Sequence, residues 1–247
     1  MSLFRPVNLV CPSCGTLIVM QAVGSVNADR RPDLRDAILE DRFQDVTCGS
    51  CGKSFRLQPE FNYLDVGRGQ WIAGMPAARM PSHLEVEDEV SAVFAQSYGA
   101  GAPQAAREVG DGLTVRLTFG WPAIREKLLL AGAGLDDAVV EMMKLDLLRR
   151  LPSAPLGPGT ELRLVRATDD LLALVWIDTA TEKGQGEIVL PRAAYDEMLA
   201  GVEAWAGVRA QLTDGPFVDI QKLYMGLGRG AAPPPAPVAE LEPADGL

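Results

Sequence analysis

The chain contains one histidine, His83, among its 247 residues. A single imidazole excludes metal sites built from several histidines, and any Ser/His/Asp or Cys/His mechanism would have to use this one side chain. The Gly-x-Ser-x-Gly, His-Glu-x-x-His and dinucleotide-binding glycine motifs are also absent. These absences argue against the common hydrolase, zinc-protease and dehydrogenase classes. An enzyme with its site in the α/β part of the chain is kept as an alternative.

Long apolar runs are absent as well. The best candidates, Leu128–Leu130 and Leu171–Ile177, are far shorter than the roughly 20 apolar residues of a membrane-spanning helix. The first residues, Met1–Pro6, lack the charged start and apolar core of a signal peptide. We therefore expect a cytoplasmic protein with no membrane partner.

Positive charge is scarce. The chain has 23 Lys and Arg against 33 Asp and Glu, a formal net charge of −10. Such a chain repels phosphate backbones over most of its surface, so nucleic acid is disfavoured as a partner. Aspartates interleave with a local group of arginines, which we interpret as a solvated helix face: Arg30, Arg31, Arg35 and Arg42.

Cysteine is limited to four residues, which form two Cys-x-x-Cys-Gly segments, Cys11–Gly15 and Cys48–Gly52. This spacing lets a tight turn direct both thiols at one point, and the trailing glycine permits the positive φ of such a turn. The pattern predicts a structural Zn²⁺ held by Cys11, Cys14, Cys48 and Cys51. Four thiolates leave no coordination position for a catalytic water. A redox or iron site and four unmetallated core cysteines are the alternatives, and disulfides are disfavoured in a cytoplasmic chain.

Each cysteine pair is flanked by short strand-like segments, and a helix is expected between the pairs. Pro32 suits a first helical turn, and Leu34, Ala37 and Ile38 fall on one helical face. The sequence therefore predicts an α+β fold with a zinc-ribbon-type β lobe over residues 5–60, interrupted by an inserted helix.

A mixed α/β region should follow this lobe. We expect a first domain over residues 1–150, an α+β lobe over 158–226 after a Pro/Gly boundary at 153–159, and a disordered acidic tail rich in Pro and Ala over 227–247. The expected helices lie within 85–98, 122–131, 135–151, 192–200 and 203–213. The expected strands lie within 61–76, 113–119, 161–167, 171–178 and 186–190. Residues 99–103 are expected to be a flexible link.

Several segments together resemble the CpXC family, a bacterial and archaeal domain named for its Cys-Pro-x-Cys motifs. They are Cys11–Gly15, residues 32–40, residues 43–53 and Tyr63–Asp65, and residues 119–127 and 135–144 are similar to the family's helical second half. The resemblance is specific over about the first 70 residues and extends to about residue 150. Gly49 departs from it, standing where the second motif would have proline. The resemblance implies a metal-binding domain and no particular reaction.

Charged side chains offer weaker candidates for a site. Asp136, Asp137 and Glu141 have the spacing of an acid/base or metal cluster, but the positive end of a helix explains the two aspartates, and Lys144 is spaced to pair with Glu141. His83, near a predicted helix start, is interpreted as a surface residue.

The remaining features are interpreted structurally. Residues 125–127 (Arg-Glu-Lys) should form a charged helix face, and Gly226–Gly230 a hinge without the lysine of a phosphate loop. The tryptophans are expected to pack in cores: Trp71, Trp121, Trp176 and Trp205.

The sequence therefore favours a zinc-binding protein that acts without catalysis, as an interaction or adaptor module with protein partners. A zinc-ribbon regulator associated with nucleic acid is the second hypothesis, and an enzyme is the third.

Overall fold

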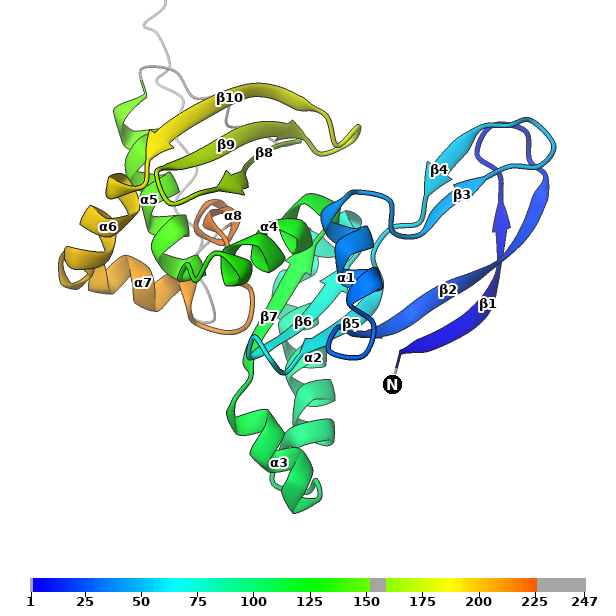
Figure 1. Cartoon of the computed structure of the whole chain (residues 1–247), viewed down its shortest axis with the longest axis horizontal. Helices are drawn as coiled ribbons and strands as arrows, with labels where there is room; N and C mark the ends of the chain where they lie inside the picture. The colour runs from blue at the N-terminus through cyan, green and yellow to red at the C-terminus, as the bar shows by residue number, and fades with distance from the viewer. Residues whose placement is uncertain (1, 152–158, 226–247) are drawn as a thin grey trace, which may run out of the picture.

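The predicted α+β class is confirmed by a computed structural model, which describes residues 2–151 and 159–225 (Figure 1). The strands are β1 (Leu3–Val10), β2 (Leu17–Asn27), β3 (Asp45–Thr47), β4 (Ser54–Arg56), β5 (Phe61–Asp65), β6 (Gln70–Met75), β7 (Thr114–Phe119), β8 (Thr160–Ala167), β9 (Leu171–Asp178) and β10 (Gly184–Pro191). The α-helices are α1 (Pro32–Leu39), α2 (His83–Tyr98), α3 (Gln104–Asp111), α4 (Trp121–Gly132), α5 (Asp137–Arg150), α6 (Ala193–Ala200), α7 (Ala206–Leu212) and α8 (Ile220–Tyr224).

The largest sheet has the strand order β1-β2-β5-β6-β7. β6 pairs antiparallel with β5 and parallel with β7, and helices cover both of its faces. Successive side chains of a strand point to opposite faces. Accordingly, Ile72 packs with Trp121 and Ile124 of α4, whereas its neighbour Trp71 packs with Val90 of α2. Burial on both faces explains the continuous apolar run of this strand.

The N-terminal part of this sheet leaves the body of the protein. β1 and residues 17–25 of β2 form one hairpin, and β3 with β4 forms a second, so that the loops of both hairpins lie together at the far end (Figure 1). We call residues 3–21 and 45–57 the arm. Its buried apolar side chains are Cys11, Val46 and Cys48. The arm therefore has almost no hydrophobic core of its own.

A second core lies between α5 and the three-stranded antiparallel sheet β10-β9-β8. It joins Val139 and Met142 of α5 to Leu164 of β8 and Leu174 of β9. This core thus contains residues from both sides of the segment 152–158. The predicted boundary between domains 1–150 and 158–226 stays a prediction.

The structure differs from the sequence-based expectations in several elements, among them α8, where no helix was expected. Residues 104–111, directly after the expected link, form α3, and the helix expected over 203–213 is divided into a 3-10 turn (Val202–Trp205) and α7. The predicted tail and the Gly226–Gly230 hinge lie outside the described residues. No helix within residues 2–151 or 159–225 is long and apolar enough to cross a membrane.

Candidate metal centre

The four cysteines meet at the far end of the arm. Their sulfur atoms all lie within 4.8 Å of one another. Cys11 Sγ is 3.7 Å from Cys51 Sγ, and Cys14 Sγ is 3.6 Å from Cys48 Sγ, so each close pair joins the two hairpins. Disulfide sulfurs would be about 2.05 Å apart. Four sulfurs placed tetrahedrally about 2.3 Å from a zinc ion would be about 3.8 Å apart. The observed separations therefore fit a shared metal ion.

The two cysteine turns have the same backbone geometry. The Gly15 N–H donates to the Cys11 carbonyl at 2.9 Å, and the Gly52 N–H donates to the Cys48 carbonyl at 2.8 Å. Both glycines have positive φ, +74° for Gly15 and +70° for Gly52, a region that residues with a Cβ rarely adopt. The trailing glycines of the sequence motif thus let each turn close.

Hydrogen bonds favour thiolates at two of the four positions. A hydrogen bond with the Thr16 side chain and one from its backbone N–H lower the pKa of Cys14 to about 6. The N–H groups of Cys51 and Ser50 lower the pKa of Cys48. At Cys51 the Lys53 N–H acts in the same direction, but desolvation and the three neighbouring thiols outweigh it and raise the pKa to about 12. A divalent cation at the centre would supply the charge that lets all four ionise.

A matched pair of glycine variants tests this geometry. We expect Gly15→Ala to lower metal affinity about tenfold, because forcing a Cβ into the left-handed region costs about 1–2 kcal/mol. Gly49→Ala should have little effect, since Gly49 is not among the positive-φ residues and a Cβ there meets nothing within 4 Å. Competition with a chromogenic chelator measures both affinities. Equal affinities would contradict the proposed role of the turn.

Within the part of the chain that the structure describes, these cysteines are the one group of His, Cys, Asp or Glu side chains placed to share a metal ion. The molecule is thus an α+β protein with a four-cysteine centre capable of binding metal. The family model described as CpXC protein matches residues 9–144, more than half of the chain, and the protein belongs to this family. No curated protein and no solved structure matches the chain.

His83 is not the surface residue that the sequence suggested. It is 5% exposed and contacts the ring of Phe217, and neither ring nitrogen has a hydrogen-bond partner among the described residues. Burial lowers its pKa. The expectation failed because the segment that covers His83 lies far away in the sequence.

The interpretation of residues 125–127 as a charged helix face is also wrong. Glu126 and Lys127 are buried, and Arg125 pairs with Asp41 at 2.8 Å. Lys144 Nζ lies 2.7 Å from Glu126 Oε1, and both side chains have no exposed surface. The buried carboxylate of Glu126, in the middle of α4, is thus neutralised inside the protein by Lys144 of α5.

The Asp136, Asp137 and Glu141 cluster has structural partners. The carboxylate of Asp136 accepts hydrogen bonds from the N–H groups of Ala138 and Val139 and so caps α5. Glu141 pairs with Lys144 at 2.8 Å, as the spacing predicted.

Charged side chains from distant segments complete a buried network of ion pairs around α5. Arg163 of β8 donates to Glu126 at 3.0 Å and to Asp219 at 2.6 Å. Burial and the nearby Asp219 and Glu126 charges outweigh Lys144 and raise the pKa of Glu141 to about 7. The sequence analysis did not predict this network. The one signal for it in the sequence is the helical spacing of acidic and basic residues within α4 and α5. Trp71, Trp121 and Trp176 are buried as expected.

Proposed function

We propose that the protein is a zinc-binding interaction module, in which a structural Zn²⁺ fixes the arm in a zinc-ribbon-type fold and the arm presents a surface to a protein partner. The observation that carries the proposal is the four-sulfur cluster with separations of 3.6 and 3.7 Å. Four thiolates close the coordination sphere, so the ion would have no free position for a substrate or water. Its role would be to hold the two hairpins together.

The surface beside the cysteines supports an interaction role. Val10, Leu17 and Val19 are 64%, 63% and 66% exposed. Val10 lies opposite Leu17 in the β1–β2 register, and Leu17 and Val19 point to the same face because side chains alternate along a strand. We call these three residues the arm strip. Exposed apolar groups in contiguous array are typical of protein-binding surfaces.

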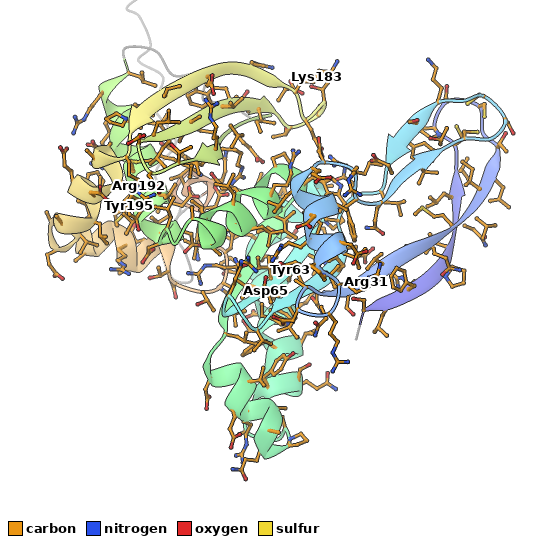
Figure 2. The ribbon with its side chains drawn as sticks, in the orientation of Figure 1. Arg31, Tyr63, Asp65, Lys183, Arg192 and Tyr195 are labelled. Carbon is orange, nitrogen blue, oxygen red and sulfur yellow. The ribbon has the colours of Figure 1, made fainter. Side chains whose placement is uncertain are left out.

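At the base of the arm, next to the body, an arginine contacts the exposed apolar surface. The guanidinium of Arg31 lies 5.6 Å from the ring centroid of Phe4, and Figure 2 shows Arg31 where the arm meets the body. This contact covers part of the Phe4 ring, which remains 47% exposed. The arm strip lies at the other end of the arm, beside the cysteines, where its three side chains are more exposed than Phe4.

Tagged wild-type protein and a Leu17→Glu/Val19→Glu variant test the proposal in affinity purification from native host cells. We expect the variant to lose at least one protein that the wild type captures, because a charge on the arm strip opposes apolar contact. Val93→Glu, at an exposed valine of α2, is the matched control and should keep it.

Two results would contradict the interaction role. One is an identical set of captured proteins for the wild type and the arm variant. The other is binding of the wild type to immobilised DNA at low salt that the arm variant shares, which would favour the nucleic-acid hypothesis.

A further inference from the structure

A pocket of about 280 Å³ lies on the body of the protein, away from the cysteines. It is formed where the first residues of β6 and β7 meet α4 and the start of α5. Its lining has a basic side, with Arg68, Arg116 and Lys127, and an apolar side that includes Leu130 and Leu135. Binding sites for small molecules commonly combine apolar walls with a few converging polar groups.

Arg116 offers unused hydrogen-bond donors to this pocket. Its Nε and Nη2 donate to the two oxygens of Asp137 at 2.7 and 2.8 Å, and its Nη1 donates to the Val115 carbonyl at 2.8 Å. A guanidinium has five N–H donors. Two of them therefore have no partner among the described residues. The side chain is one-fifth exposed, so it is held rigidly and yet reachable.

The carboxylates of the lining are already neutralised. Asp137 pairs with both Arg116 and Lys127, the latter at 2.8 Å. Burial opposes its ionisation, but the Lys127 charge and the bonds from Arg116 outweigh burial and hold its pKa well below the usual range. Asp136 caps α5 and pairs with Arg209 at 3.1 Å. Both acids of the lining are engaged, and Arg68 pairs with Asp65, which lies outside the lining, so the lining groups themselves carry three positive charges and two negative ones.

The two walls are fixed from behind by residues labelled in Figure 2. Arg68 donates to the buried carboxylate of Asp65 at 3.1 Å, and Asp65 also accepts from the Tyr63 hydroxyl at 3.1 Å. On the other wall, the Tyr195 hydroxyl accepts from the Asp136 N–H at 2.9 Å. The pocket is therefore positioned on both sides by hydrogen bonds that are buried or partly buried.

Gln70 adds an unmatched acceptor. It lines the pocket and is 8% exposed. Its Nε2 donates to the Lys127 carbonyl at 3.1 Å, which fixes the orientation of the amide, whereas its Oε1 has no hydrogen-bond partner among the described residues. A buried acceptor without a donor is costly, so a molecule that brings a donor to this atom gains affinity.

We propose that this pocket binds a small hydroxycarboxylate. Its carboxylate would pair with Arg68 and the free donors of Arg116, and its hydroxyl would donate to Gln70 Oε1. The volume is just below the roughly 300–1,000 Å³ of ordinary ligand pockets, which favours a metabolite of a few carbon atoms over a nucleotide. The site is independent of the metal centre, so either proposal can fail alone.

Isothermal titration calorimetry of the full chain tests the site with malate, lactate and glycerate, with succinate as the matched probe that lacks malate's hydroxyl. We expect one malate per chain and about tenfold weaker binding of succinate. Arg68→Met should weaken malate binding about tenfold, while Arg107→Met, at an exposed arginine of α3, should leave it unchanged.

The Gln70→Leu variant separates the hydroxyl contact from general damage. We expect it to bind malate and succinate equally well, and this ratio is read within one variant, so a partial loss of stability does not affect it. Three results would overturn the proposal: no heat from any hydroxycarboxylate at millimolar concentration, tighter binding of inorganic phosphate than of all three, or unchanged malate binding by Arg68→Met.

Discussion

Replacing Cys48 by Ser is expected to release the metal and to unfold the arm while the body stays folded. The arm buries Cys11, Val46 and Cys48 and little else that is apolar, so its two hairpins have no core that could hold them together without the ion. Structural zinc contributes about 10–16 kcal/mol of apparent binding free energy in zinc-finger peptides. The body keeps its own cores, which include the second half of β2 through Val23 and Val26.

Elemental analysis and hydrogen exchange read the two parts of this prediction separately. Wild-type protein should contain about one zinc ion per chain, and Cys48→Ser should contain none. Amides of the arm should lose protection from exchange in the variant, while those of β5 and β6 should keep it. Ser50→Ala, in the same turn but with a side chain that is not a ligand, is the control. If wild-type protein contained no metal and its arm amides were nevertheless protected from exchange, the structural role of the metal would be contradicted. Iron in place of zinc would correct the identity of the metal.

The four-cysteine cluster was predictable because its signal is local. Each Cys-x-x-Cys-Gly turn is closed by a hydrogen bond from Gly15 or Gly52 to the first cysteine of its own motif. Five consecutive residues are therefore enough to determine the geometry of each turn. What the sequence could not supply is the order β1-β2-β5-β6-β7, since it depends on which strands pair across long connections.

The buried charges were not predictable for the opposite reason. Residues 125–127 are three consecutive charged residues, which is typical of a solvated surface, but Lys144 and Arg163 from later segments pair with Glu126 inside the protein. His83 follows the same rule, because Phe217 covers it. α3 was missed because it is short and its inner side consists of small, half-buried residues, Ala106, Val109 and Gly110.

Replacing Lys144 by Met is expected to destabilise the folded protein by about 3–5 kcal/mol, the usual cost of removing one partner of a buried ion pair. Lys144 lies 2.7 Å from Glu126 and 2.8 Å from Glu141, and all three side chains have no exposed surface. Methionine keeps much of the volume, so the loss is electrostatic: two carboxylates keep their desolvation and lose the cation nearest to both. Arg163 still reaches Glu126 but is shared with Glu161 and Asp219.

Urea unfolding of Lys144→Met and of the matched control Arg150→Met measures this cost. Arg150 lies on the same helix and pairs with Asp146, but it is 75% exposed, so its loss should cost under about 0.5 kcal/mol.

The pH dependence of the stability loss identifies its cause. Burial opposes ionisation of Glu126, yet Lys144 and Arg163 lower its pKa in the wild type. Without Lys144 this pKa rises in the folded state, and a group with a raised folded pKa loses stability as pH increases. The deficit of the variant should therefore be larger at about pH 8 than at about pH 5, where protonation relieves the stranded carboxylates. A deficit that is the same at both pH values, or no larger than that of Arg150→Met, would mean that packing and not charge holds α5 in place.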